Sequence, residues 1–549
     1  MNEIRVNKPN KNKFDLSHEV KMSGEMGNLY PCFIHDVIPG DSYRVDTQQL
    51  VRFSPMLAPM MHNVDFKLDY FFVPYRLVWD EWKDFITGGE DGNDLPSFPR
   101  VQVDQTLCTT YLQKGSLADY MGVPPQITSD NKAGAWANPS GSQYLDMLKF
   151  RAYQLIYHEY FRDQNVGTEY SQYKTSGIQT GNLDDQLVLR KSNWKKDYFT
   201  SALPFLQRGA EVTLPLGSTA PLLYGDYANP LSQTGLTTDN TVVRKPYSTD
   251  PNYLVSNLGI SSLTTDSDAR IQSGSTKVNF DVSSTHAVDL STATGATINE
   301  LRKASALQQW LELMARAGSR YREQIYAVFG ERIPDYTVQI PKYLGGGKTS
   351  IMVSEVLSTY SDTVRDSATT GTTENRPMGD MAGHALGLGD NIGFSQSFDE
   401  HGVILGLCRV IPKASYVQGL DRFWQKFDKF DHYFPQFANL GEQEIYNKEL
   451  YVDGTDTADS TIFGYQQRYA EYKYKESRIA GDFRDTLAHW ELSRRFPGNA
   501  PLLNQSFIEC TPDDRIFAIN TDDDKIWMSL YHKVDALRPI PYFSNPSLT

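Results

Sequence analysis

Residues 64–74 read VDFKLDYFFVP, and the pattern of this stretch decides the fold class. In its first half, the charged residues Asp65, Lys67 and Asp69 alternate with apolar ones. An alternation with a period of two predicts a β-strand that has one face in a core and one face in water. In its second half both faces are apolar, so we expect another layer of structure over that end of the strand. Pro74 ends the strand, because proline has no amide hydrogen to donate to a neighbouring strand.

Two other stretches, distant in the sequence, also have the composition of strands. Residues 403–411, VILGLCRVI, are apolar apart from Arg409 and predict a strand buried on both faces. Residues 526–536 alternate in character, and we expect them to follow a strand at 516–520 through a hairpin turn at Asp522–Asp524. Strands from both ends of a chain of 549 residues predict a mainly β protein. The architecture we expect is an eight-stranded jelly roll, a β-sandwich or barrel with long loop and helical insertions.

The insertions themselves show helical periodicity. Apolar residues recur on one helical face between Tyr144 and Asp163. A clearer helix is expected from Asn299 to Phe329, with a capping box at its start and an interruption at Gly318. Between these two helices, residues 218–297 are rich in Ser, Thr, Gly, Asn and Asp, and such a segment cannot bury much of its own surface. We expect a loop region or small excursion that neighbouring parts of the chain support.

The charge of the chain limits what it can bind. It contains 53 Lys and Arg against 67 Asp and Glu, a formal net charge of −14. Because affinity for phosphate comes largely from Lys and Arg, an acidic chain is a poor non-specific binder of nucleic acid. Any DNA contact must be a local basic patch, or depend on a separate basic protein. We place such patches on the polar N-terminal arm and in the Tyr-rich residues 463–478. The arm could equally be a flexible solvated terminus, and for residues 463–478 we favour a solvated or inter-subunit face. The candidate nucleic-acid residues are Lys8, Lys11, Lys13, Arg468, Lys473, Lys475 and Arg478.

A second candidate surface mixes aromatic and charged side chains between residues 415 and 451. Aromatic faces and cations together can stack the bases of a single strand. Aromatic residues and Arg are also enriched at subunit interfaces, and we favour that interpretation. The candidate interface residues are Phe423, Trp424, Phe427, Tyr433 and Phe434.

The sequence has no recognisable catalytic constellation, neither a nucleophile elbow nor an HExxH motif. Residues 347–349, Gly-Lys-Thr, match the end of a phosphate-binding loop, but the motif requires a glycine where this chain has Lys342. A glycine turn is therefore a better interpretation than an NTPase. Four cysteines that lie far apart suggest buried free thiols instead of a zinc site or a disulfide framework. We expect no enzyme activity, no cofactor and no metal.

No targeting signal is evident in the sequence. The first residues lack the apolar core of a signal peptide, and no apolar run approaches the length of about 18 residues that a membrane span needs. We therefore expect a soluble protein that is made and kept inside a cell.

Several strings resemble the major capsid protein of the Microviridae, the small icosahedral single-stranded DNA phages, and its gokushovirus-like branch in particular. The strings are SPMLAPMMHNVDFKLDYFFVPYRLVWDEW at residues 54–82, FRAYQLIYHEYFRDQN at 150–165, KKDYFTSALPFLQRGAEVTLPLG at 195–217 and TINELRKASALQQWLELMARAGSRYREQIYAVFG at 297–330. Similar strings extend from residue 14 to the C-terminal tail and miss chiefly residues 218–297.

The resemblance implies a structural protein that self-assembles, with about sixty copies in a T=1 icosahedral shell around circular single-stranded DNA. It implies as partners other copies of the chain, the genome, a small basic DNA-binding protein, scaffolding and pilot proteins of the phage, and a bacterial surface receptor that meets the exterior loops, without membrane insertion. The expected location is the virion, assembled in the bacterial cytoplasm. The alternative is a jelly-roll carbohydrate-binding protein or glycan-active enzyme, which aromatic platforms and acidic loops fit loosely.

The expected domain organisation has four parts. Residues 1–21 are a flexible polar arm, and residues 22–217 and 298–549 form the shell domain with its C-terminal arm. The resemblance implies that the insertion between them, residues 218–297, forms a protrusion at the threefold axes of the particle.

Overall fold

The computed structural model describes residues 10–126, 136, 139, 141–210, 212, 297–357, 359, 381–498, 500–519 and 523–543, together with short strands between 222 and 288 and at 362–363 and 375–376. The chain divides into two compact units. One unit contains Met1–Arg208 and Glu312–Thr549, and the other contains Gly209–Leu311.

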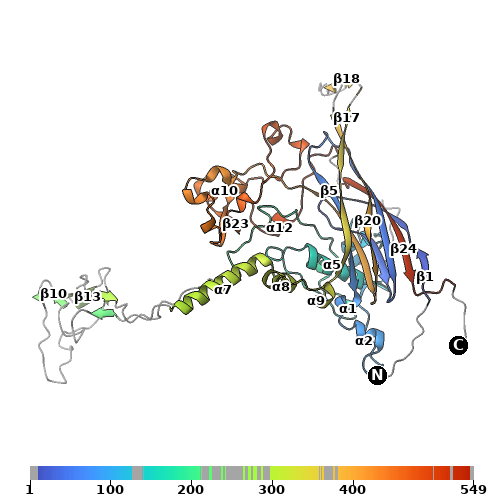
Figure 1. Ribbon diagram of the computed structural model, residues 1–549, viewed down its shortest axis with the longest axis horizontal. Helices are drawn as coiled ribbons and strands as arrows, with labels where there is room; N and C mark the ends of the chain where they lie inside the picture. The colour runs from blue at the N-terminus through green and yellow to red at the C-terminus, as the bar shows by residue number, and fades with distance from the viewer. Residues whose placement is uncertain are drawn as a thin grey trace. The chain divides into compact units, whose positions relative to one another are not determined.

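The larger unit contains two antiparallel sheets that form a β-sandwich (Figure 1). The first sheet has the order β1-β24-β4-β20-β17, with β2 also paired to β24, and the second has the order β16-β5-β21-β3. The strands of the first sheet are β1 (Asn12–Asp15), β2 (His18–Gly24), β4 (Ser42–Phe53), β17 (Met352–Leu357), β20 (Met381–Ser397) and β24 (Ile526–Arg538). Those of the second are β3 (Tyr30–Val37), β5 (Val64–Pro74), β16 (Lys342–Ser350) and β21 (Gly402–Pro412). The mainly β fold predicted from the sequence is confirmed.

Strand β5 has the environment that its alternation predicts. Phe66, Leu68 and Tyr70 are buried in the core between the two sheets. Phe71 and Val73 face the opposite side and pack in a second buried cluster with residues of helix α5 (Leu148–Ile156). The expected additional layer over the end of the strand is therefore present. Strand β21 likewise contributes alternate residues to both clusters, so its burial on both faces is also confirmed.

The C-terminal strand β24 lies inside the first sheet. It pairs along one edge with β4, from Ile526 opposite Phe53 to Leu537 opposite Ser42. Its other edge pairs with β2 and β1. Because both edges are occupied, no edge remains for the hairpin partner that we predicted at residues 516–520. That prediction is wrong for residues 516–519, where only Phe517 makes an isolated bridge, to Met56. Residues 520–522, which include Asp522 of the predicted turn, lie outside the described residues.

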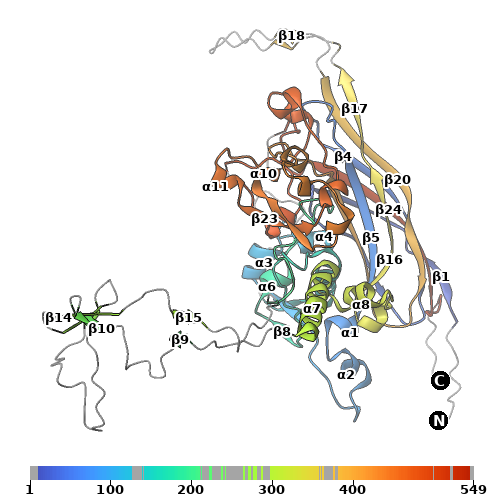
Figure 2. The ribbon, with the colours of Figure 1, turned by 60° about the vertical axis from the view of Figure 1, so that its left-hand side comes forward.

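The N-terminal arm differs from its expected form as well. Residues 12–15 and 18–24 are strands, because they supply the backbone pairs that the free edge of β24 requires. Any flexible arm is therefore shorter than the predicted residues 1–21, and residues 1–9 lie outside the described part of the chain. In Figure 2, β17 and β20 run side by side at the opposite edge and extend beyond the other strands of the sheet.

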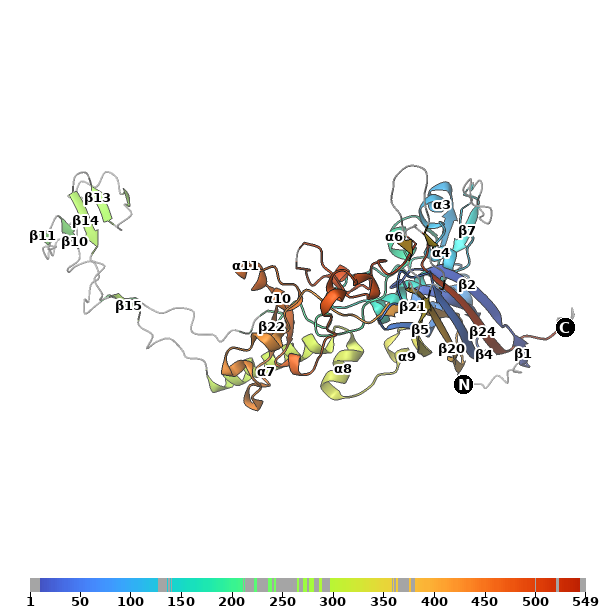
Figure 3. The same cartoon turned by 90° about the horizontal axis from the view of Figure 1, so that it is seen from above.

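Short helices and a small sheet cover the outer face of the second sheet (Figure 3). The helix predicted from Tyr144 begins later, because residues 143–146 form a strand and Asp146 Oδ1 accepts a hydrogen bond of 2.7 Å from the Leu148 amide. The helices that cover the outer face of the second sheet are α1 (Tyr75–Val78), α2 (Trp82–Thr87), α3 (Gln105–Tyr111), α4 (Leu117–Tyr120), α5, the π-helix η1 (Tyr157–Phe161) and α6 (Leu183–Gln186). The small sheet contains β7 (Gln143–Asp146), β6 (Arg100–Val103) and β8 (Ile178–Gln179).

Further helices follow the insertion. Helix α7 (Ile298–Ala317) is separated from α8 (Tyr321–Phe329) at Gly318, which has a φ of +104° that favours glycine. The predicted interruption is therefore confirmed. Residues 347–349, the phosphate-loop-like motif, lie in the extended strand β16 opposite β5. Helix α9 (Asp335–Val338), not a strand, precedes them, so the phosphate-loop geometry of strand, loop and helix is not formed.

The remaining elements are short. The C-terminal third of the larger unit contains η3 (Arg422–Gln425), η4 (Lys429–Asp431), η5 (Pro435–Phe437), β22 (Glu442–Tyr446), α10 (Asn447–Leu450), α11 (Asp456–Asp459), β23 (Ile462–Gln467), η6 (Ala470–Tyr472), η7 (Gly481–Arg484), η8 (Ala488–Trp490) and α12 (Gln505–Ile508). The strand pair β18 (Asp362–Thr363) and β19 (Asn375–Arg376) follows β17 in the chain. All four cysteines are buried and free.

Among its described residues, the smaller unit contains two sheets. One has the order β11-β10-β14-β13-β12 and the other pairs β15 with β9. The strands are β9 (Leu222–Tyr224), β10 (Leu236–Thr238), β11 (Thr241–Val242), β12 (Thr264–Thr265), β13 (Arg270–Ser273), β14 (Thr276–Phe280) and β15 (His286–Val288). The rest of the predicted insertion, up to residue 296, lies outside the described residues.

Candidate subunit and DNA interfaces

The predicted interface residues all lie on an exposed segment, residues 422–437, which we call the aromatic segment. It contains the three short helices η3, η4 and η5 and the residues that connect them. The exposed fractions of the five candidate side chains range from 42% for Phe434 to 91% for Phe427. Large aromatic side chains gathered at the surface of a chain with an ample core mark a contact with another molecule.

The backbone of the aromatic segment is held in place while its rings remain largely exposed. The Asp421 side chain accepts a hydrogen bond of 3.0 Å from the Phe423 amide and so caps η3. Lys426 points inward: its Nζ lies 3.6 Å from the centre of the Tyr472 ring and 3.5 Å from Glu471 Oε1. A surface whose backbone is fixed loses less entropy on binding than a mobile one.

Three of the four predicted DNA-binding residues between 468 and 478 form hydrogen bonds or an ion pair with other parts of the chain. Arg468 donates to the Phe430 carbonyl oxygen at 3.2 Å, and Lys473 donates to Gln467 at 2.7 Å. Lys475 forms an ion pair of 2.7 Å with Asp421. Only Arg478, among these four, has neither a hydrogen bond nor an ion pair within the described residues. Three of the four cations therefore support the local fold.

The three N-terminal candidates are on or before the edge strand β1. Lys13 is exposed and its Nζ lies 2.9 Å from Asp535 on the neighbouring strand β24. Lys11 is exposed immediately before β1. Lys8 lies outside the described residues. The role of all seven cations in DNA binding stays a prediction.

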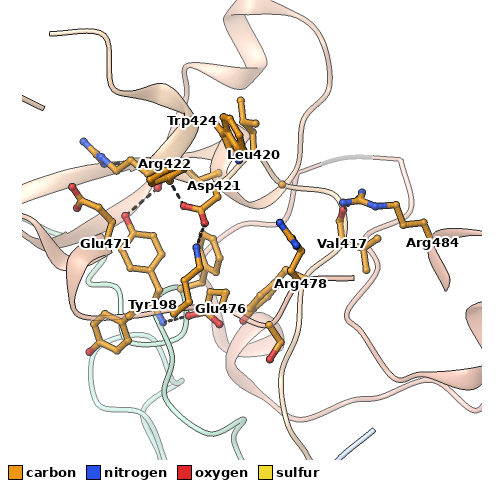
Figure 4. A pocket seen from close by; sticks show the side chains of 18 residues that line it. Tyr198, Val417, Leu420, Asp421, Arg422, Trp424, Glu471, Glu476, Arg478 and Arg484 are labelled. Carbon is orange, nitrogen blue, oxygen red and sulfur yellow. Dashed lines mark hydrogen bonds and ion pairs between the residues drawn. The ribbon is translucent and has the colours of Figure 1, made fainter. Parts of the chain in front are cut away.

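One cavity of about 430 Å³ brings together residues from both predicted sets (Figure 4). Phe423 and Trp424 line it, and so do Lys475 and Arg478. No sequence pattern places these two pairs together, because about fifty positions separate them.

The charges of this cavity are balanced. Its acidic lining residues are Asp421, Glu449, Glu471 and Glu476, and its basic ones are Arg422, Lys475, Arg478 and Arg484. Burial, and then the nearby Asp197, raises the pKa of Glu476 to about 7. A cavity with as many carboxylates as cations does not concentrate positive charge, so it is a weak phosphate site. Sequence reasoning missed Glu449, which accepts a hydrogen bond of 3.0 Å from the Tyr198 hydroxyl, because nothing in the spacing links these positions.

Comparison with known proteins gives the family. The profile of a family described as capsid protein (F protein) matches residues 2–548. The chain belongs to this family. It is 33% identical to capsid protein VP1 of Chlamydia phage 1, over 98% of this chain and 96% of the relative. It is 34% identical to capsid protein VP1 of Bdellovibrio phage phiMH2K, over 98% and 95% of the two chains, and 29% identical to that of Spiroplasma virus 4, over 98% and 95%.

The predicted resemblance to the major capsid protein of the Microviridae is thus confirmed over nearly the whole chain. Membership of this family gives the chain a structural role in the virion and makes self-assembly its central property. Within the described residues, no helix has both the length and the apolar character of a membrane span. For a capsid protein, the exposed aromatic segment is the best-formed candidate for a contact between copies.

Proposed function

We propose that this capsid protein builds a T=1 icosahedral shell of about sixty copies, in which the aromatic segment is buried between neighbouring subunits. The observation that carries the proposal is the exposure of five aromatic side chains on a backbone that hydrogen bonds and Lys426 hold in place. Burial of such rings between subunits removes apolar surface from water in every copy of the shell.

The order of the strands supports an eight-stranded jelly roll as the shell domain. The long strands β2, β3, β4, β5, β16, β20, β21 and β24 are the first to the eighth in chain order. The first sheet then contains strands one, eight, three and six side by side, and the second contains two, seven, four and five. Each sheet takes strands from both halves of the chain, as the two Greek keys of a viral jelly roll require.

We further propose circular single-stranded DNA as the content of the shell. The net charge of −14 requires help with neutralising phosphate, which a small basic DNA-binding protein of the phage would supply. Scaffolding and pilot proteins are the proposed assembly partners in the bacterial cytoplasm. The insertion at residues 218–297 is the proposed threefold protrusion and the contact with a bacterial surface receptor.

Electron microscopy of the assembled protein tests the role of the aromatic segment. We expect small icosahedral particles from the unmodified chain, produced with the other phage proteins, and loss of those particles in the variant Trp424→Asp/Phe427→Asp. Two carboxylates at a buried interface would be costly to desolvate. The variant Trp424→Phe/Phe427→Tyr keeps the aromatic surface and should still assemble. Particles of normal yield from the aspartate variant would refute the proposed contact.

A further inference from the structure

A second cavity, of about 520 Å³, has a different charge from the first. It lies in the larger unit, between the outward side of β5 and β21, the residues that follow η1, and the junction of α7 with α8. Seven of the residues that line it are Lys or Arg, and Asp163 is the single acidic one. We call it the cationic pocket. Such a concentration of positive charge stands out in a chain whose net charge is −14.

Carboxylates within 4 Å already hold four of the seven cations in place. Arg409 pairs with Asp69 at 2.8 Å, and Arg320 pairs with Glu159 at 3.2 Å and Glu323 at 3.3 Å. The other two pairs are Arg316 with Glu442 and Lys196 with Asp163. These pairs fix the walls of the cationic pocket and leave little of their charge for a ligand.

The other three cations, Lys67, Arg162 and Lys195, have no carboxylate within 4 Å among the described residues. Lys67 is half-buried on β5, and burial followed by the charge of Arg409 lowers its pKa. Arg162 donates through Nη1 to the Gly167 carbonyl oxygen at 3.1 Å, but its Nε is buried without an acceptor. The ordinary structural role of a lysine or arginine in an ion pair therefore does not account for these three.

A neutral donor in the same wall also lacks a partner. Trp194 is 3% exposed, and its Nε1 has no hydrogen-bond acceptor within the described residues. A buried N–H group without an acceptor is costly, so such groups are rare unless a ligand or water supplies one. Trp194 lines the cationic pocket and also a second cavity of about 310 Å³, and the three cations without a carboxylate partner favour an anionic ligand in the cationic pocket.

The aromatic rings of the cationic pocket argue against recognition of a nucleic-acid base. Arg409 lies over the Phe161 ring at 4.6 Å, Arg494 over the Trp194 ring at 5.1 Å, and Arg322 over the Tyr160 ring at 5.1 Å. Each ring thus already has a guanidinium on one face, whereas proteins bind the bases of single strands by stacking them on aromatic faces. The pocket is suited to a compact charged group.

We propose that the cationic pocket binds a compact phosphate-bearing anion, with Lys67, Arg162 and Lys195 supplying the positive charge. Its volume lies within the range of about 300–1,000 Å³ that is usual for small-molecule sites. Arg and Lys donate charge-assisted hydrogen bonds to phosphate oxygens, and these are stronger than bonds between neutral groups. This site is separate from the proposed contact between subunits. An anion that binds the folded subunit here stabilises it by an amount that rises with the logarithm of the anion concentration once that concentration exceeds the Kd.

Calorimetric titration of the full-length protein with inorganic pyrophosphate tests the proposal. We expect saturable binding to a single class of site and an affinity at least about tenfold weaker in the variant Lys67→Gln/Lys195→Gln. Neither lysine has an ion-pair partner among the described residues, so the fold should tolerate their loss. The matched control, Lys83→Gln/Lys114→Gln, removes two exposed lysines outside the pocket and should bind like the unmodified protein.

Two results would overturn the proposal. One is the absence of saturable pyrophosphate binding, and the other is an equal loss of affinity in the pocket variant and the control, which would indicate non-specific charge attraction. A parallel titration with an oligothymidylate separates the sources of phosphate. Oligonucleotide binding that depends on Lys67 and Lys195, without pyrophosphate binding, would replace the small anion with a DNA backbone.

Discussion

The core between the two sheets and the aromatic segment use the same residue types in opposite environments. Phe66 and Tyr70 on β5 are fully buried within a single chain, whereas Phe427 is 91% exposed. Both regions have a fixed backbone, so exposure does not reflect a lack of local structure. This difference in exposure indicates that the sandwich stabilises the subunit, whereas the aromatic segment presents apolar surface to another molecule.

The largest effect on subunit stability is expected from Phe66→Ala. This change removes a ring that is 0% exposed and leaves a cavity between the sheets, which costs about 3–5 kcal/mol of the free energy of unfolding. Urea unfolding of unassembled subunits measures it. A loss below about 1 kcal/mol would show that the core of the sandwich does not dominate stability.

A smaller loss of subunit stability is expected when the pH is lowered. His18, His35 and His532 lie together, with 5.2 Å between the ring centres of His18 and His35 and 5.3 Å between those of His18 and His532. Burial, followed by the charge of His18, lowers the pKa of His35 to about 4 and that of His532 to about 3.

Both histidines are therefore neutral in the folded subunit at pH 5, whereas in the unfolded chain they take up protons below about pH 6.5. Their contribution to stability is complete above that pH and is lost as the pH falls towards 4. Between pH 7 and 5 we expect a loss of up to about 2 kcal/mol for each of these histidines. Urea unfolding at several pH values measures the slope. The variant His35→Phe, which keeps a ring against Phe33, should have a shallower slope, and an unchanged slope would contradict this assignment.

The smallest effect on stability is expected from Phe427→Ala. Because the ring is exposed, its removal should change the free energy of unfolding of the subunit by less than about 0.5 kcal/mol. The same urea measurement applies, with Phe66→Ala as the comparison. A loss similar to that of Phe66→Ala would mean that the aromatic segment belongs to the core and not to an interface.

The features that the sequence predicted correctly depend on local pattern. The alternation at Asp65, Lys67 and Asp69 and the apolar run at 403–411 each determined the burial of a strand from its own residues. The break at Gly318 also followed from a single residue. The predictions that failed depend on the pairing of strands that lie far apart in the sequence. The strand predicted at 516–520 was wrong because β2 and β1 occupy the edge of β24 that it needed, and no local pattern reveals which edge is taken.

The candidate sites show the same limit. The aromatic segment was found because its rings are close together in the sequence, at positions 423–434. The cationic pocket was missed because its unpaired cations come from residues 67, 162 and 195, which lie in charged surroundings without any recognisable spacing. Only the packing of the insertions against the second sheet brings them together.

The position of β24 between β4 and β2 has a consequence for how the protein is made. Residues 18–53 leave the ribosome early, yet their partner strand begins only at Ile526. The first sheet therefore stays incomplete until β24 has been synthesised, with the facing edges of β2 and β4 lacking their shared neighbour. The sandwich thus reaches its final form only after β24 has been synthesised.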